Sequence, residues 1–451
     1  MATVLDSSIF APLFSDEGVA KLFDDHAQVR ALVAVEVALA RAEARVGVIP
    51  ATAAEQIANA VDPNKIDIAA LTKGTIRSGF PIIALVQEMR KAVGGEAASY
   101  VHWGATTQDI MDTACVLQLR SAIELFKDRI AELARRLSEL SNRHRTTVAA
   151  GRTHGQQALP VSFGLKVAAW LAPLVRHAER LEEISPRLLV VQFGGAAGTL
   201  ASLGDRGLAV MEALAQELKL ATPSMSWHAQ RDSLVEFAGW LSLVTGSLGK
   251  MAQDIILLAQ TEVDEVAESG EEGRGGSSTM PQKSNPITSE LIVTAARVNA
   301  SLLSATHQAL IQEHERATHG WQMEWLTLPQ MVILTSGALR NAVYLANNLR
   351  VDQRKMRDNI ARANDVVLAE AAVFALARVM PRPKADELVK NACSIAVSEG
   401  KPLIEVVRTL AAGLVSDGTV DWPALAMPEN YIGETEKMID RVLKSASDLW
   451  S

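Results

Sequence analysis

Apolar residues recur at helical spacing along most of this chain. The clearest run lies between Gly104 and Gly151, where neither glycine nor proline occurs. Its apolar positions are Ile110, Leu117, Ile123, Ile130, Leu133, Leu137 and Leu140. The same pattern predicts long helices over residues 161–183, about 230–266, 287–319 and 330–349. Thirty helical residues span about 45 Å, more than one compact core needs, so these helices predict a bundle that oligomerises.

The two ends of the chain predict shorter helices. Residues 16–46 read as one helix, which Ser15 can cap and Gly47 can end. Prolines and glycines then break the pattern repeatedly up to Gly104, and again over the last hundred residues. The chain is therefore expected to be all-α. Its expected domains are an N-terminal helical domain (1–104), a central helical bundle (105–350) and a C-terminal helical domain (351–451).

Composition excludes several classes of protein. The 451 residues carry a net charge of -8 and no basic tract, which argues against binding to nucleic acid or an anionic membrane. We find no signal peptide, and no apolar run approaches a membrane span. The only cysteines, Cys115 and Cys393, are expected to be reduced thiols in a cytoplasmic protein. No Cys/His constellation predicts a metal site, and no Gly-x-Ser-x-Gly motif predicts a serine hydrolase.

The first candidate for chemistry is "YVHWGATTQD", residues 100–109. Thr106, Thr107 and Gln108 stand at the start of the longest predicted helix, where free backbone amides attract anions. Simple capping is the alternative, because Thr106 and Asp109 together resemble a capping box.

Three further polar segments are candidates. In "GRTHGQQALP" (151–160), a polar loop between helices holds a cluster of Arg152, Thr153, His154 and Gln156, which favours a site over a solvated loop. "WHAQRD" (227–232) and "QEHER" (312–316) could be interhelical salt bridges or parts of a site. The sequence leaves Arg231 undecided between the two and favours the site for Arg316.

The last candidate is "GEEGRGGSSTMPQKSNPITSE", residues 270–290. Asn285 can cap a helix that begins at Pro286, so the positive end of that helix would face the preceding loop. Lys283 adds a full charge, and the glycines let the loop that carries Ser277 move. This pattern predicts a carboxylate cradle beside a serine, suited to abstracting a proton next to a carboxylate, with flap closure excluding water.

These residues resemble a known family. "GGSSTMPQKSNP" is similar to the signature of the aspartase/fumarase superfamily, Gly-Ser-Ser-x-Met-Pro-x-Lys-x-Asn-Pro. The resemblance implies a three-domain, all-α homotetramer with a five-helix bundle in each chain. It also implies a twenty-helix core, active sites shared by three subunits and no cofactor. It implies Ser277 as base, His154 as acid or its orienter, and Lys283 and Asn285 as carboxylate ligands. We expect substrate contacts to extend to His102, Ser278 and Met280 in the same segments.

The chain as a whole most resembles one branch, the bacterial 3-carboxy-cis,cis-muconate cycloisomerases. Two departures stand out: His154-Gly155-Gln156 where that branch usually has Trp-Leu-Gln, and Ser284 where it usually has Arg. A cycloisomerase has no amine leaving group to protonate. The retained histidine therefore predicts a carbon–nitrogen lyase that releases fumarate from a small N-substituted aspartate such as iminodisuccinate.

Three alternatives stay open. The cycloisomerase itself is the first. Adenylosuccinate lyase is the second, although "MATVLDSSIFAPLF" lacks the Arg-Tyr pair expected for its phosphate. A catalytically dead structural homologue, as some lens crystallins are, is disfavoured because Ser277, His154 and Lys283 are all present.

Overall fold

A computed structural model describes residues 3–270, 273–276, 279–280 and 282–450 of the chain. The described residues are mostly helical and divide into two compact units. Unit 1 comprises residues 1–129, 177–246 and 294–340, and unit 2 comprises residues 130–176, 247–293 and 341–451. Five long helices run through both units: α7 (Thr107–Arg143), α8 (Phe163–Leu188), α10 (Asp232–Leu258), α11 (Ile287–Gln308) and α12 (Gly320–Asn348).

Unit 1 also holds the N-terminal helices and one helix from later in the chain. They are α1 (Ala11–Phe14), α2 (Glu17–Ala20), α3 (Asp25–Val46), α4 (Ala51–Ala60), α5 (Ile68–Ser78), α6 (Ile82–Val93) and α9 (Gly207–Leu218). Short 3₁₀ turns η1 (Lys21–Phe23), η2 (Pro63–Lys65), η3 (Glu96–Tyr100) and η4 (Ala201–Arg206) connect them. Helix α3 packs against α4 and α9 around a buried aliphatic core. Asp24 caps α3 by accepting a hydrogen bond from the Ala27 amide, and Gly47 ends it in the left-handed conformation.

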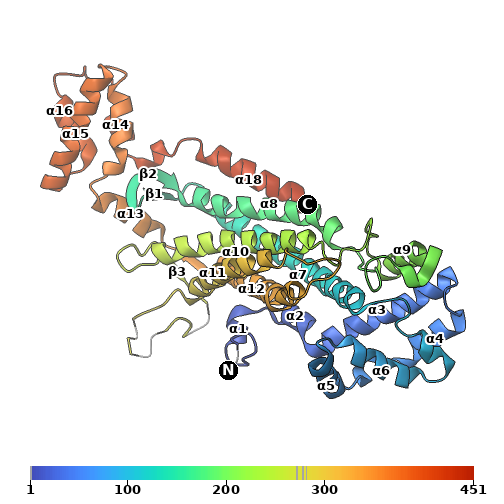
Figure 1. Ribbon diagram of the computed structural model, residues 1–451. Helices are drawn as coiled ribbons and strands as arrows, with labels where there is room; N and C mark the ends of the chain where they lie inside the picture. The colour runs from blue at the N-terminus through green and yellow to red at the C-terminus, as the bar shows by residue number, and fades with distance from the viewer. Residues whose placement is uncertain (1–2, 271–272, 277–278, 281, 451) are drawn as a thin grey trace. The chain divides into compact units, whose positions relative to one another are not determined.

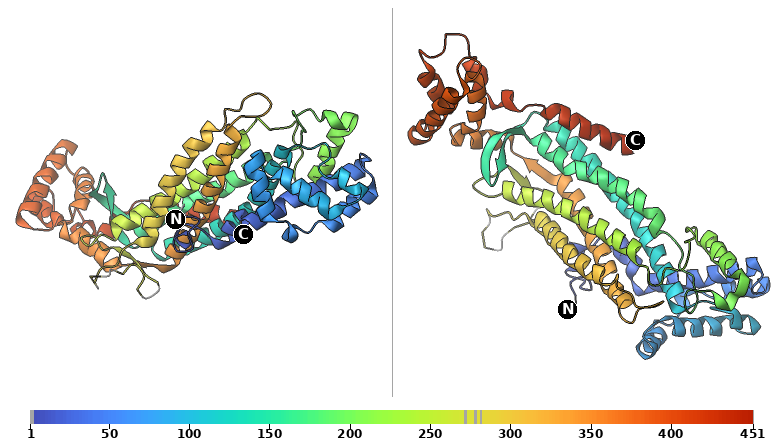
Figure 2. Two further views of the ribbon diagram at one scale, coloured as in Figure 1. Left: turned by 60° about the horizontal axis from the view of Figure 1, so that its bottom comes forward. Right: turned by 45° about the horizontal axis from the view of Figure 1, so that its top comes forward.

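Two buried residues join the long helices within unit 1. The Trp240 indole of α10 packs on Phe126 of α7 and donates a hydrogen bond to the His177 carbonyl of α8. The Asn299 amide of α11 donates to Thr335 of α12 at 2.9 Å and also contacts Thr245 of α10. The unit 1 portions of these helices lie side by side in both Figure 1 and Figure 2. The expected five-helix bundle is therefore present.

Unit 2 adds two short antiparallel sheets and the C-terminal helices. The sheets are β1 (Val148–Thr153) with β2 (Gln156–Ser162), and β3 (Val266–Glu268) with β4 (Leu349–Val351). The C-terminal elements are α13 (Gln353–Arg362), η5 (Val366–Leu368), α14 (Ala369–Leu376), α15 (Arg382–Glu399), α16 (Leu403–Ala411), α17 (Trp422–Leu425), η6 (Pro428–Tyr431) and α18 (Thr435–Trp450). Strand β1 contributes Val148 and Ala150 to the core that α13–α16 form.

The all-α prediction is confirmed, with differences in detail. Ser15 does not cap the helix over 16–46, because its hydroxyl donates back to the Ala11 carbonyl, and separate caps start α2 and α3. The last long helix does not begin after Pro329 but at Gly320, and it runs through the proline. Residues 151–160 are not an irregular loop but part of the β1–β2 hairpin. The predicted domain boundaries near 104 and 350 remain predictions.

One expectation about apolar runs needs correction. Among the described residues, α10 is long and apolar enough to cross a membrane by length and composition alone. Half of its most apolar window is buried inside the protein, as in the core helix of a bundle. Cys115 and Cys393 are both free and half-buried, and burial raises the pKa of Cys115 to about 12.

Candidate active site

The predicted site residues fall into two sets, one in each unit. Unit 1 holds His102, Thr106, Thr107, Gln108, Arg231 and Arg316, and unit 2 holds Thr153, His154, Gln156, Met280, Lys283 and Asn285. Ser277 and Ser278 lie outside the described residues. No group of His, Cys, Asp or Glu side chains within the described part of the chain is arranged to bind a metal ion.

In unit 1 the start of α7 is organised by the buried carboxylate of Asp109. Its Oδ2 accepts hydrogen bonds from the amides of Thr106 at 3.0 Å and Gly195 at 2.9 Å. Its Oδ1 accepts from the Gly194 amide at 2.9 Å and lies 2.7 Å from Nε2 of His228. The Asp109 half of the expected capping box therefore forms, and it also fixes the Gly194–Gly195 loop beside the helix.

The first turn of α7 keeps free donors. The amides of Thr107 and Gln108 have no acceptor among the described residues, at the positive end of a 37-residue helix. The Gln108 side chain is buried: its Nε2 donates to the His228 carbonyl, while its Oε1 has no partner in the described structure. An anion could bind at the two amides, but Gln108 contributes its backbone there and not its side chain.

Arg316 joins this cluster from the segment between α11 and α12. Its Nη1 donates to the Thr106 hydroxyl at 2.9 Å, and its Nη2 donates to the Ala196 carbonyl at 3.0 Å. Its Nε is buried and has no acceptor among the described residues. The guanidinium thus brings a positive charge to the start of α7, which supports the site interpretation of Arg316.

Of the two roles that the sequence left open for Arg231, the structure shows the interhelical salt bridge. Its side chain is fully buried and donates to both oxygens of Asp112 at 2.7 and 2.9 Å, and to both oxygens of Glu324 at 2.8 and 2.6 Å. Burial lowers its pKa, but the two carboxylates raise the pKa of Arg231 overall. With its donors all engaged, Arg231 joins α7, α10 and α12 and cannot bind substrate in this structure.

In unit 2 the hairpin places His154 at its tip. Thr153 pairs with Gln156, so His154 and Gly155 form a two-residue turn with φ of 51° and 77°. Positive φ at both central positions is the geometry of a type I′ turn, which suits the strand twist. The side chains of Thr153, His154 and Gln156 are exposed.

A buried ion pair anchors this hairpin. Arg152 donates from Nη1 and Nη2 to the two carboxylate oxygens of Glu265, at 2.9 and 2.6 Å. Glu265 is completely buried and also accepts a hydrogen bond from Asn359 at 2.9 Å. Arg152 therefore stabilises the position of the hairpin. His154 lies two residues later, at the end of the strand that this ion pair holds in place.

The loop before α11 closes on itself through its glycines. Gly276 and Ser284 form an antiparallel bridge, and the Asn285 amide donates to the Gly275 carbonyl at 2.8 Å. A side chain at Gly275 would collide with the Asn285 carbonyl, and the φ of Gly275 is +73°. Lys283 and Met280 are exposed beyond this bridge.

The start of α11 differs from the sequence prediction. Asn285 was expected to cap the helix and leave its amides free for a substrate carboxylate. Instead Glu268 accepts hydrogen bonds from the amides of Thr288 at 3.0 Å and Ser289 at 2.8 Å. A carboxylate of the chain itself therefore satisfies the α11 amides, and only Lys283 and the Asn285 side chain remain as the predicted ligands here.

Three histidines of the candidate segments share an unusual backbone. His102, His154 and His314 adopt φ of 63°, 51° and 51°, the left-handed region that is costly for residues other than glycine. His314 was not predicted as a site residue. The only indication in the sequence that His314 could belong to a site is its position in the polar "QEHER" segment, two residues before Arg316.

The long helices and the glycine-rich segment before α11 agree with the resemblance to the aspartase/fumarase superfamily. The comparisons identify the family: residues 14–299 match the family described as lyase, and the chain belongs to it. The 3-carboxy-cis,cis-muconate cycloisomerase of Pseudomonas aeruginosa is 43% identical over 446 residues, which cover 98% of this chain and 97% of the relative.

Solved structures agree with this assignment. The 3-carboxy-cis,cis-muconate lactonizing enzyme of Pseudomonas putida is 40% identical with a TM-score of 0.93, over 99% of this chain and all of the other. A fumarate lyase from Mesorhizobium sp. BNC1 is 42% identical with a TM-score of 0.88, over 96% of this chain and 98% of the other.

The comparisons overturn the predicted activity. A carbon–nitrogen lyase of the iminodisuccinate type was inferred from His154, but full-length relatives at about 40% identity are cycloisomerases, the alternative that the sequence had left open. The lyase prediction rested on His154, a single residue at a hairpin tip, whereas the similarity to cycloisomerases extends over nearly the whole chain. The exposed position of His154 in unit 2 does not by itself specify a leaving group.

Proposed function

We propose that this protein is a cofactor-independent, cytoplasmic 3-carboxy-cis,cis-muconate cycloisomerase that works as a homotetramer. The observation that carries the proposal is the set of cycloisomerases about 40% identical along nearly the entire chain. The free amides at the start of α7, the guanidinium of Arg316 and the exposed Lys283 support it. Such donors suit a substrate with three carboxylates.

The reaction adds one carboxylate of the substrate to its own double bond. A carboxylate oxygen forms a C–O bond with one alkene carbon, and the π electrons move into the carboxylate conjugated with that alkene. The resulting aci-carboxylate then takes a proton at carbon, which gives a lactone. One π bond is lost, one C–O bond and one C–H bond form, and there is no net oxidation or reduction.

The chain's residues would act on the charge that develops. Lys283 and Asn285 would stabilise the aci-carboxylate, as preorganised donors do in a dry site. Ser277, assigned by the family resemblance, would deliver the proton to carbon and would be the base in the reverse direction. His154 at the hairpin tip would donate a hydrogen bond to a substrate carboxylate instead of protonating a leaving group.

Assembly would bring these residues together. Several large apolar side chains on the long helices are exposed in the single chain, among them Leu243 at 53%, Leu257 at 50% and Leu326 at 68%. Contact between subunits would cover them. In the tetramer the α7 start, the hairpin and the signature loop would reach each site from three different chains.

The test is turnover of 3-carboxy-cis,cis-muconate by the purified protein, followed as loss of the absorbance of the conjugated diene. We expect Ser277→Ala to lower kcat by roughly 10²–10⁴-fold while leaving folding unchanged, since it removes a proton donor. Iminodisuccinate, supplied in parallel, should release no fumarate. A folded tetramer that leaves the diene absorbance unchanged would refute the proposal.

A further inference from the structure

Two carboxyl groups lie in the apolar core of unit 1, and three of their four oxygens have no hydrogen-bond partner among the described residues. Glu36 and Glu43 project from α3 and are 2% and 0% exposed. Glu43 has no hydrogen-bond partner for either oxygen among the described residues, and neither has Oε2 of Glu36. Buried polar atoms are usually satisfied, so a cluster of three unsatisfied oxygens needs a reason other than stability.

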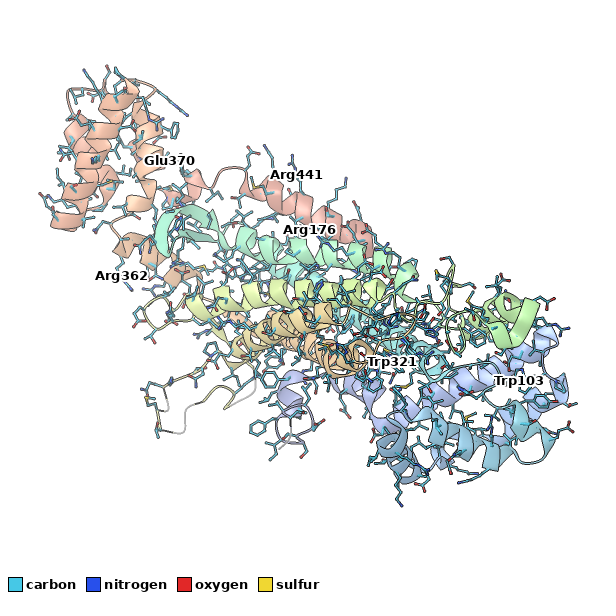
Figure 3. All side chains as sticks on the ribbon, viewed as in Figure 1. Trp103, Arg176, Trp321, Arg362, Glu370 and Arg441 are labelled. Atoms are coloured by element: carbon cyan, nitrogen blue, oxygen red, sulfur yellow. The ribbon has the colours of Figure 1, made fainter. Side chains whose placement is uncertain are left out.

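The remaining oxygen of this cluster contacts a histidine. Oε1 of Glu36 lies 2.7 Å from Nδ1 of His102, whose side chain is 18% exposed while that of Glu36 is 1% exposed. His102 adopts the left-handed conformation five residues before the first turn of α7. The imidazole thus has one nitrogen on a buried carboxylate, and part of the ring is open to solvent next to the segment that starts α7. Figure 3 labels its neighbour Trp103, which is 42% exposed.

The charges around His102 favour its cationic form. Burial is the largest single influence and lowers the pKa of His102, but the charge and hydrogen bond of Glu36 together with the charge of Asp109 raise the pKa overall. Arg90 acts in the opposite direction. Burial, followed by the charge of Glu36, raises the pKa of Glu43 to about 9, so Glu43 keeps its proton at neutral pH and adds no charge.

We propose that Glu36 is a positioning residue that holds His102 as an imidazolium, so that His102 supplies a positive charge to one carboxylate of a polycarboxylate substrate. The inference deepens the proposed function and rests on it for the substrate class. Glu36 itself touches no substrate. Because Glu36 is buried, its ion pair with His102 is shielded from water. The electrostatic attraction between the two charges is therefore stronger than it would be at the surface.

The test uses binding of an inert tricarboxylate, propane-1,2,3-tricarboxylate, measured by calorimetry from pH 6 to pH 9. Wild-type affinity should fall at the alkaline end as His102 loses its proton. In Glu36→Gln the amide oxygen still accepts from Nδ1–H, but the charge is gone. The fall should therefore occur at a lower pH than in the wild type. Below that pH the affinities of the two proteins should converge, which a merely structural defect would not allow.

Two variants complete the test. Glu43→Gln is the matched control on the same helix: up to pH 8, where Glu43 still carries its proton, it replaces a neutral buried carboxyl and should leave the binding profile unchanged. His102→Asn should remove the alkaline fall and weaken binding at neutral pH. Proton-carbon NMR of the His102 ring, assigned by its loss in His102→Asn, should show a lower pKa in Glu36→Gln than in the wild type.

The outcomes separate this inference from the proposed function. The protein could bind the tricarboxylate with a pH profile that depends on Glu36 and yet not turn over 3-carboxy-cis,cis-muconate. That result would support the inference about His102 and contradict the proposed activity. If the protein turns over 3-carboxy-cis,cis-muconate but the pH profile of tricarboxylate binding is the same in wild type and Glu36→Gln, the proposed activity stands and the inference about His102 is wrong. An unshifted His102 titration in Glu36→Gln would also overturn the inference.

Discussion

Nε2 of His228 lies 2.7 Å from Oδ1 of Asp109, although the two residues are 119 positions apart in the sequence. Both side chains are almost completely buried, at 2% and 1% exposure. The contact joins the segment after α9 to the first turn of α7, where the predicted anion-binding amides of Thr107 and Gln108 lie. The geometry of this helix start therefore depends on an interaction between two buried side chains.

Asp109→Asn should destabilise the fold. The carboxylate accepts four hydrogen bonds, and an amide would place its NH₂ group against two of those donors. Leaving buried donors unsatisfied costs about 1–3 kcal/mol each, so we expect a loss of about 3 kcal/mol in the free energy of unfolding. Urea unfolding measures it. Asp358→Asn, an exposed position on α13, is the control and should be close to neutral. Equal effects of the two substitutions would show that Asp109 is not structural.

Arg231→Met should also destabilise, by about 3–5 kcal/mol, because it leaves the Asp112 and Glu324 carboxylates buried without their cation. Replacing all three residues with apolar side chains should recover most of that loss. The triple variant should also bind propane-1,2,3-tricarboxylate as the wild type does. A triple variant that is stable but no longer binds the tricarboxylate would restore Arg231 to the list of substrate ligands.

Stability should depend on pH through Glu43. Its pKa is about 9 in the folded protein against 4.5 in the unfolded chain. Between those values the unfolded state releases the proton that the folded state keeps, so the Glu43 contribution makes the protein less stable as pH rises. Glutamine has no proton to lose. The melting temperature of Glu43→Gln minus that of the wild type should therefore grow from pH 5.5 to pH 8.5. A constant difference would mean that Glu43 titrates alike in both states.

Shared active sites predict complementation between inactive chains. Ser277→Ala homotetramers should be nearly inactive, and His154→Asn homotetramers should be strongly impaired, because the shorter asparagine cannot replace the imidazole contact with the substrate carboxylate. The two variants are then unfolded together and refolded as mixed tetramers. Each site receives an intact serine with a probability of about one half and, from another chain, an intact histidine with a probability of about one half, so about a quarter of the sites should have both. Mixing without subunit exchange is the control and should restore nothing. Mixed tetramers that are confirmed by mass but stay inactive would assign both residues of a site to one chain.

Features with a local cause were predictable from the sequence. The long helices followed from uninterrupted apolar periodicity, and the end of α3 followed from Gly47, which adopts φ of 75°. Features with a distant cause were not. The cap on α11 comes from Glu268, about twenty residues before the amides that it binds. The buried role of Arg231 depends on Asp112 and Glu324, which lie about a hundred positions away on either side.

Two other misses came from weak local signals. The sequence predicted a loop in place of the β1–β2 hairpin because the segment around His154 is polar and flanked by glycines. The turn residues His154-Gly155 are also not among the commonest pairs for a type I′ turn. The sequence predicted that helix α12 begins after Pro329, because proline usually ends a helix. In the structure the helix begins at Gly320 and contains Pro329. The burial of Gln108 and the left-handed backbone of His102 became visible only with the packing around them.

The most direct measurement of the proposed function is product analysis in D₂O. The purified protein is incubated with 3-carboxy-cis,cis-muconate, and the reaction is followed by proton NMR, with iminodisuccinate in a parallel sample. Ring closure followed by protonation at carbon predicts a lactone that carries one solvent deuterium at the newly protonated carbon, and no fumarate in the parallel sample. The vinyl singlet of fumarate from iminodisuccinate, with the muconate unchanged, would contradict the assignment as a cycloisomerase.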